Sequence, residues 1–515
     1  MTVRQKRAIL GAPGPSGRTS SGRQAKAAVA LRPLPPNLIL ALVCAGVFVA
    51  SLDQTVVVTA LPEVMFDLEI DVTRLDDAAW IVTAYLLGFT AAMPLLGRVG
   101  DVYGHRRLYL GAVLLFATGS ALVAVAQGLG WVIGARIVQA LGGGAMVPAA
   151  LALASARAPA ARRSVVLGVV GAAAEAGSVL GPLYGGLIID LAGWRWIFWA
   201  NIPLGALLLA GLLAVKEAPL RRSRLDLRGG ALATGGLALV TLALGQPSTF
   251  TFASPFSFGL LASGLTLLGL LVVAEGHVSQ PLFHGTLFLS RPFLAAFTTQ
   301  LLVGGALIMA LVTVPLMTDT VLGHPPLEGG LRLMRFTGAI PVGAVLGGYA
   351  SRWLGTRIPT ILGLGLGALG FLWMSGWDLA IGEPALSLHL LTGGLGFGLV
   401  IAPILTVAVN AGGQEYRGTA AALITVARML GMTLGLAALS AWGMGHFRAL
   451  VAGLPLPLPA AGETAGLFQE RLTSYQSTVT GSALAVYSAF FRTGAWLSLA
   501  AALPALLMYE RRPRP

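Results

Sequence analysis

The sequence is poor in charge and almost without cysteine. Only 11% of its 515 residues are Asp, Glu, Lys or Arg, and 56% are hydrophobic. A soluble domain carries about 25% charged residues, so this composition excludes an ordinary soluble protein and indicates a protein embedded in a membrane. The single cysteine, Cys44, leaves no disulfide framework and no cysteine metal site within one chain.

Motifs for nucleotide and metal chemistry are also missing. The sequence contains no Walker loop for phosphate binding, so ATP is not expected as the energy source. None of the 6 histidines forms a pair with the helical spacing of metal ligands, and we interpret them as surface residues. We therefore expect neither a metal nor a cofactor.

Long apolar runs are what the sequence has in abundance. A helix needs about 20 apolar residues to cross a bilayer. Fourteen such runs are present, which predicts an all-α polytopic membrane protein. They cover about 38–60, 78–97, 108–127, 131–153, 165–189, 196–215, 229–245, 257–275, 293–316, 332–350, 359–377, 386–409, 419–443 and 485–508. Residues 444–484 are expected to form a moderately polar loop.

The basic residues gather on one side of the predicted membrane. The net charge of +13 would by itself suggest a nucleic-acid partner. However, 25 of the 34 basic residues lie in segments on the side of the N-terminus, whereas the first loop of the other side is rich in acids. This is the bias of a membrane protein with basic cytoplasmic loops. We therefore expect both termini in the cytoplasm and no nucleic acid.

An internal repeat predicts how the chain is divided. Two inward loops share glycine and arginine at a constant offset: Gly97, Gly104 and Arg106 match Gly348, Gly355 and Arg357. Each loop joins the second and third helices of a unit, which favours two six-helix halves, as in many transporters. Chance recurrence of tight Gly/Arg loops is the alternative.

The expected organisation is a disordered cytoplasmic tail (1–36), an N-terminal six-helix bundle (37–216), a linker with two extra transmembrane helices (217–277), a C-terminal six-helix bundle (278–509) and a cytoplasmic tail (510–515). An organelle transit peptide is the alternative for residues 1–36.

Five charged residues lie inside apolar runs, where a charge is costly and by default marks a functional site. Asp53 and Arg136 are expected at about the same depth, because a helix rises about 1.5 Å per residue. Glu175 and Arg428 are expected near the midplane, on the fifth helix of each half, where a contact between the halves is plausible. Arg492 has no clear partner in the sequence and would snorkel or line a cavity. A permanent structural ion pair is the alternative for each acid.

Two motifs are specific enough to indicate a family. The loop after the second run reads Gly97-Arg98-Val99-Gly100-Asp101-Val102-Tyr103-Gly104-His105-Arg106-Arg107. The fifth run contains Gly177-Ser178-Val179-Leu180-Gly181-Pro182-Leu183-Tyr184-Gly185-Gly186. The first resembles the signature loop of the major facilitator superfamily, with Val102 where a basic residue is usual. The second resembles the antiporter signature of exporters in this superfamily. Taken alone, its small residues four apart would only be a packing stripe.

Further motifs narrow the resemblance. The segments 52–62, 136–144 and 194–205 are similar to signatures of the fourteen-helix drug:proton antiporter family. The segments 80–98, 175–185 and 427–443 look like a mycobacterial branch of that family. That branch is associated with export of triacylglycerides and drugs, and acts with a lipid-binding lipoprotein. The resemblance implies the major facilitator fold, with two six-helix bundles and two extra central helices.

The same resemblance, together with the buried charges, predicts residue roles. Asp53 is expected to be the main proton carrier, tuned by Arg136, with Glu175 and Arg428 as a central gate or second proton site. The switch loop would consist of Gly97, Asp101, Gly104 and Arg106, and the antiporter motif of Gly177, Gly181, Pro182, Gly185 and Gly186. Asp101 would cap a neighbouring helix or pair with an arginine across the halves, and so favour the outward-facing state.

The predicted function is a proton-coupled exporter of hydrophobic drugs or similar amphiphiles, working by alternating access in a bacterial plasma membrane. A lipid exporter of the same fold, for a triacylglyceride or glycolipid, is the alternative. A membrane-embedded lipid-modifying enzyme and a pure sensor or scaffold are more distant alternatives. The expected energy source is the proton gradient. The expected partners are a hydrophobic small molecule or lipid substrate, membrane lipids, and a periplasmic or surface lipoprotein as a candidate.

Overall fold

The computed structural model describes residues 35–70, 75–215, 225–244, 254–278, 285–454, 457–458 and 464–509, and within these ranges every regular element is helical. The predicted tails, 1–36 and 510–515, lie outside the described residues apart from positions 35 and 36. The predicted linker, 217–277, is described only in part.

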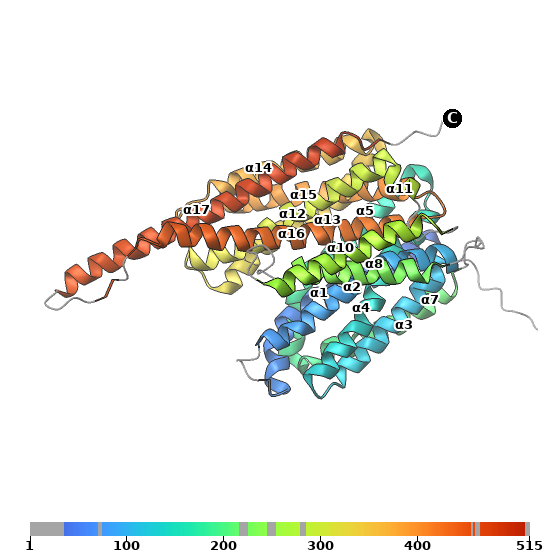
Figure 1. Ribbon diagram of the computed structural model, residues 1–515, viewed down its shortest axis with the longest axis horizontal. Coiled ribbons are helices and arrows are strands. Elements are labelled where there is room, and N and C mark those ends of the chain that lie inside the picture. Colours follow the sequence, from blue (N-terminus) through green and yellow to red (C-terminus); the bar gives the residue numbers. More distant parts are fainter. Residues whose placement is uncertain are drawn as a thin grey trace, which may run out of the picture.

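In the first half of the chain, the described residues form seven helices and one short 3₁₀ turn. These are α1 (Pro36–Asp67), α2 (Leu75–Tyr103), α3 (His105–Ala124), α4 (Leu129–Arg157), η2 (Ala160–Arg162), α5 (Arg163–Ala192), α6 (Arg195–Trp199) and α7 (Asn201–Leu213). Two further helices, α8 (Leu227–Leu244) and α10 (Pro255–Glu275), follow and pack on each other, with α8 against α2 (Figure 1).

The second half repeats the arrangement. It consists of α11 (Gly285–Leu289), α12 (Arg291–Thr320), α13 (Pro326–Leu354), α14 (Arg357–Ser375), α15 (Ala385–Ala411), α16 (Arg417–Val451) and α17 (Ala465–Ala505). The packing pairs correspond: α1 lies along α5 as α12 lies along α16, and α2 lies along α4 as α13 lies along α15. Between the halves, α5 packs on α13 and α2 packs on α16.

A glycine with positive φ joins the second and third helices of each half. Gly104, between α2 and α3, has φ +102°, and Gly355, between α13 and α14, has φ +76°. Side chains disfavour such angles, so glycine permits this abrupt change of direction. The glycines that mark the sequence repeat therefore occupy equivalent tight turns.

The number of membrane spans is only partly settled by the helices. Twelve described helices, with α6 and α7 forming one span, are long and apolar enough to cross a membrane. The 29 residues of α13 and the 41 residues of α17 also suffice in length, but these two helices are not among the twelve. Charged residues such as Arg332 and Arg335 lower the hydropathy of α13. The total of fourteen spans stays a prediction.

The predicted loop at 444–484 is largely helical, which corrects the sequence analysis. Helix α16 continues to Val451, and α17 already begins at Ala465, so that α17 projects beyond the other helices in Figure 1. Residues 465–484 are too polar for a hydropathy pattern to register as a span. The hydroxyl of Thr464 nevertheless caps the helix by accepting a hydrogen bond from the amide of Leu467 at 3.5 Å.

Candidate functional site

A closed network of polar side chains surrounds Asp53 inside the N-terminal half. The Asp53 carboxylate accepts from Arg136 Nη1 at 2.6 Å, from Gln139 Nε2 at 2.8 Å and from Asn201 Nδ2 at 3.3 Å. Ser120 Oγ accepts from Gln139 at 2.7 Å and from Asn201 at 3.1 Å. All five side chains are buried. Donors from α4 and α7 therefore meet on the Asp53 carboxylate of α1, and Ser120 of α3 links two of these donors.

Arg136 is held by an aromatic ring as well as by the acid. Its guanidinium lies 3.9 Å from the ring centroid of Tyr85, within range of a cation–π contact. The Tyr85 hydroxyl donates to the Ala50 carbonyl of α1 at 3.3 Å, which fixes the ring. Arg136 Nη2 and Nε have no hydrogen-bond partner among the residues described. Two nitrogen atoms of the Arg136 guanidinium therefore donate no hydrogen bond to the described residues, although they lie beside Asp53.

Glu175 and Arg428 join the two halves. Arg428 donates from Nη1 to Glu175 Oε1 and from Nη2 to Oε2, the second contact at 3.0 Å. The side chains are 12% and 17% exposed, in contrast to the enclosed Asp53–Arg136 pair. A bidentate Arg–carboxylate contact is among the stronger hydrogen-bonded pairs, and its planar geometry fixes both partners. Here it fixes α5 against α16.

A cavity of about 1690 Å³ lies between the halves and includes this ion pair in its wall. Its lining on α5 runs from Val170 to Asp190, near the end of that helix. Most of the lining is Leu, Val, Ile and Met, with Thr241 and Leu242 contributed by α8. Asp53 is not part of the lining, although its neighbour Gln54 is. The cavity therefore reaches from mid-depth toward the end of the bundle where α5 meets α6, which we call the open end.

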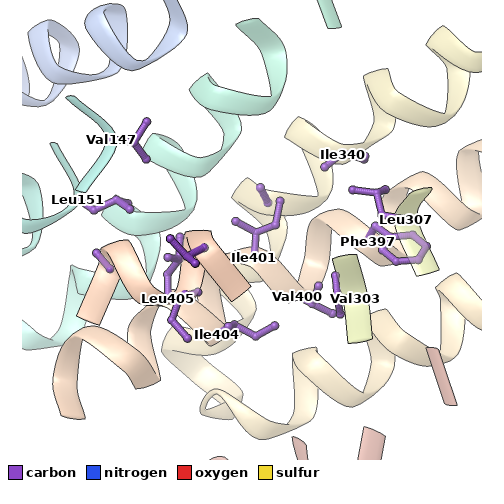
Figure 2. Close-up of a cluster of buried hydrophobic side chains, with 14 of the residues drawn as sticks. Val147, Leu151, Val303, Leu307, Ile340, Phe397, Val400, Ile401, Ile404 and Leu405 are labelled. Atoms are coloured by element: carbon purple, nitrogen blue, oxygen red, sulfur yellow. The ribbon is translucent and has the colours of Figure 1, made fainter. Parts of the chain in front are cut away.

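An apolar floor closes the cavity on its other side. Val147 and Leu151 of α4 face Ile340 of α13 and Ile401 and Leu405 of α15 (Figure 2). These side chains come from both halves and line the cavity while belonging to the same buried cluster. The hydrophobic contact between the halves thus lies below the ion pair, toward the end where α2 meets α3, which we call the closed end.

The switch loop ties the halves together at the closed end. Asp101 Oδ1 accepts from the Gly418 amide at 2.9 Å, and Oδ2 accepts from the amide and hydroxyl of Thr419 at 2.9 and 2.7 Å. These amides belong to the first turn of α16, where they lack partners within the helix. Asp101 therefore acts as the N-terminal cap of a helix in the other half. Of the two roles considered for Asp101, capping is the one seen.

The other members of the loop make different contacts. Gly97 lies against Gly418, where a Cβ atom would come within 2.7 Å of the Gly418 carbonyl oxygen. Gly104 makes the turn described above. Arg106 acts within its own half, donating to the carbonyls of Leu212 and Leu213 at 3.0 and 2.7 Å at the end of α7. A cation at a helix C-terminus satisfies orphan carbonyls and the helix dipole.

The antiporter motif divides into two faces of α5. Gly177, Gly181 and Gly185 press on α1, and an added Cβ at Gly177 would collide with the Phe48 carbonyl. Pro182 and Gly186 instead line the cavity. Proline at 182 cannot donate to the carbonyl of Ser178 four residues earlier. Thr55 of α1 replaces that donor, with Oγ1 at 3.0 Å from the Ser178 oxygen.

Several site residues were not singled out from the sequence. Gln139, Asn201, Ser120 and Tyr85 complete the Asp53 network. A signal was present for Gln139, which follows Arg136 by three residues and so shares its helix face. Asn201 and Ser120 lie on other helices, and no spacing rule connects them to Asp53. Arg492, expected to snorkel or to line a cavity, is exposed on α17 and does not line this one.

Two six-helix units joined at a central cavity, with charges between them, form the arrangement of a membrane transporter built from repeats. Comparison with known proteins agrees. The sequence profile of the Major Facilitator Superfamily matches residues 43–436. This protein belongs to the major facilitator superfamily, and is a multi-pass membrane transporter rather than an enzyme. Transporters of this superfamily need no cofactor, in keeping with the sequence prediction.

Several of its relatives in sequence are triacylglyceride transporters of mycobacteria. It is 36% identical over 485 residues to a triacylglyceride transporter of Mycolicibacterium hassiacum, covering 88% of this chain and 90% of that protein. A probable triacylglyceride transporter of Mycobacterium leprae is 34% identical, with 91% and 95% covered. The triacylglyceride transporter of Mycobacterium tuberculosis strain H37Rv is 35% identical, with 80% and 84% covered.

Solved structures show the same fold. The human organic anion transporter MFSD10 superposes with a TM-score of 0.62 at 17% identity, covering 92% of this chain and 100% of that one. The proton:xylose symporter XylE gives a TM-score of 0.60 at 14% identity, covering 91% and 94%. At these identities the likeness concerns the fold alone.

Proposed function

We propose that this protein exports a neutral lipid of the triacylglyceride type across a bacterial plasma membrane. The cavity is the observation that carries the proposal. Its volume of about 1690 Å³ exceeds the range of about 300–1000 Å³ typical of drug-sized ligands, and its lining is mostly aliphatic. The names of the mycobacterial relatives support the same substrate class.

We propose that export runs by rocking of the two bundles, 37–216 and 278–509, with the segment 217–277 as a linker carrying two extra spans. In this scheme the basic closed end faces the cytoplasm, both termini are cytoplasmic, and the chain has fourteen spans. The asymmetry of basic residues in the sequence supports this orientation. The structure then corresponds to an outward-facing state. A lipid leaving the open end needs an acceptor, for which a lipoprotein is the proposed partner.

The proton gradient is the proposed energy source, with Asp53 as the main proton carrier. Both Asp53 oxygens accept hydrogen bonds, so proton uptake requires a rearrangement in which Arg136 releases the carboxylate. Protonation of Glu175 would likewise remove the charge that holds Arg428, and so free α5 from α16. Each proton event would therefore change a contact between helices, which is what coupling demands.

Hydrophobic drugs are the second proposed substrate class. The observation in favour is that two acids, Glu175 and Asp190, line the same aliphatic cavity. Asp190 would offer a cationic amphiphile a negative charge beside an apolar wall, and Glu175 would do so once Arg428 releases it. A triacylglyceride carries no such charge. The two classes are therefore separable by the response to these acids.

Transport by proteoliposomes under an imposed pH gradient tests the proposal. The probes are a fluorescent triacylglyceride and a fluorescent hydrophobic cation. We expect gradient-dependent movement of the glyceride by the wild type and its loss in Asp53→Asn. Because that variant leaves Arg136 buried without its partner, the double variant Asp53→Asn/Arg136→Gln serves as a control that removes both charges. Size-exclusion profiles in detergent report whether each variant is folded.

The possible results distinguish the lipid exporter from the drug exporter and test both the role of Asp53 and proton coupling. Movement of the cation but not of the glyceride would favour the drug exporter. Equal gradient-dependent movement by the wild type and Asp53→Asn would remove Asp53 from the proton path and direct attention to Glu175. Movement that ignores the gradient would contradict proton coupling altogether.

A further inference from the structure

Gln300 is a buried amide in the wall of the cavity, and its oxygen atom makes no hydrogen bond to the described residues. The residue is only 6% exposed, and its Oε1 atom has no hydrogen-bond partner in the part of the chain that the structure describes. It nevertheless belongs to the lining of the cavity. Leaving a buried polar atom unpaired costs free energy, so such an atom is commonly satisfied by a ligand or by water.

The position of Gln300 is set by close packing of α12 on α16. One turn further along α12, Gly304 lies against the backbone of Arg428, where a Cβ atom would come within 3.1 Å of the Arg428 Cα. Gln300 therefore lies about 6 Å nearer the closed end than this contact, since four residues of helix rise about 6 Å. This places the amide low in the cavity, below the level of the Arg428 backbone.

The face of α12 that carries Gln300 is otherwise aliphatic. Leu307 and Leu311 follow Gln300 at seven and eleven residues on α12, share its helix face and also line the cavity. Val303 and Leu307 appear in the hydrophobic cluster of Figure 2 beside Ile401 and Val400 of α15. A polar group placed among such side chains selects the position of a polar atom in an otherwise apolar ligand.

We propose that Gln300 binds the oxygen atoms of the glycerol part of a glyceride, and so positions the lipid with its acyl chains along the aliphatic wall. The amide NH₂ would donate to an ester carbonyl, and the amide oxygen would accept from a free hydroxyl of a partial glyceride. The assignment rests on the proposed function, because it names the part of the lipid that the central cavity recognises. It adds a polar subsite distinct from the Glu175–Arg428 pair.

Transport of two matched probes tests the assignment. One is a fluorescent triacylglyceride, and the other is a hydrocarbon with the same fluorophore but no ester. In reconstituted full-length protein, Gln300→Leu should lower glyceride transport about tenfold relative to the hydrocarbon, as expected for loss of one hydrogen bond. Gln300→Asn, which keeps a shorter amide, should retain part of the preference.

A matched control lies on the same helix. Thr313 has a buried hydroxyl without a hydrogen-bond partner among the described residues, but it does not line the cavity. Thr313→Val should leave the transport of both probes unchanged. Equal loss of both probes in Gln300→Leu, or no loss of either, would overturn the assignment while leaving the exporter intact. A wild type that moves no glyceride would overturn the proposed function, and the role of Gln300 with it.

Discussion

Asp53 accepts three hydrogen bonds inside the N-terminal half, and two helices supply the donors: Arg136 and Gln139 lie on α4, and Asn201 lies on α7. Removing one partner of a buried ion pair usually costs about 3–5 kcal/mol, since the other charge is left without compensation. In this structure the charge of Arg136 is compensated by three contacts: the Asp53 carboxylate, the side-chain oxygen of Gln139 and the Tyr85 ring. Thr55 is a second residue with a specific partner, because its hydroxyl donates to the Ser178 carbonyl in place of the backbone N–H that Pro182 lacks.

Replacement of Thr55 by valine is expected to destabilise the contact between α1 and α5. Valine keeps the shape but leaves the Ser178 carbonyl without the hydroxyl donor that lies 3.0 Å away. We expect a loss of about 1 kcal/mol, the usual net contribution of one hydrogen bond, because this bond is only partly buried. Thermal unfolding in detergent measures it. Thr55→Ser keeps the hydroxyl and should remain close to the wild type, and equal melting of both variants would contradict the role of this bond.

At the scale of elements, two helices depend on groups outside themselves. The N-terminus of α16 has no side-chain cap from its own sequence, and Asp101 of α2 provides one from the other half. The approach of α5 to α1 depends on three glycines of the antiporter motif. A motif that reads as one unit in the sequence therefore serves two purposes, helix packing on one face and cavity lining on the other.

A pair of glycine-to-alanine variants should separate these two faces. Gly177→Ala would drive a methyl group into the Phe48 carbonyl and should cost about 1–3 kcal/mol, as is typical of overpacking. Gly186→Ala meets no atom within 4 Å and should fold normally. Melting temperatures and expression levels in the same detergent measure the difference. If the two variants were equally stable, the α1–α5 contact could not be as close as the structure shows.

At the scale of the whole molecule, the two halves share a fold but not a chemistry. At the offset of 251 residues set by Gly97 and Gly348, Tyr85 and Ser120 correspond to Phe336 and Phe371. Where the N-terminal half holds a charge network, the C-terminal half therefore packs aromatic rings, with Phe336 and Phe371 centroids 6.4 Å apart. A pair like Asp53 and Arg136 thus belongs to the N-terminal half.

Cross-linking of the closed end should stop transport if the halves must separate there. Arg163 of α5 donates to Asn410 of α15, so Arg163→Cys/Asn410→Cys places two thiols across the halves. In a Cys44→Ser background, a short bismaleimide should abolish gradient-driven transport. Arg335→Cys/Glu383→Cys, which joins two residues of the C-terminal half that form an ion pair, is the matched control and should remain active. Full activity of both cross-linked proteins would contradict rocking at this end.

The sequence by itself determined the membrane class, the helical repeat and the superfamily, because long apolar runs, a bias of basic loops and two specific motifs are local features. Its buried charges also indicated where to look, as Asp53, Arg136, Glu175 and Arg428 stand out against apolar neighbours. Hydropathy could not find the helical residues 465–484, because polar residues there give no apolar run.

Only the tertiary structure decided which groups meet. Asn201 reaches Asp53 from a helix far away in the sequence, Ser120 of another helix accepts from Asn201, and Asp101 caps α16 across 317 residues. The cavity, its aliphatic floor and the unpaired amide of Gln300 likewise have no local signature. Helix periodicity states which face of a helix is apolar, but the partner of that face depends on how all the helices pack, and this is settled only when the chain folds as a whole.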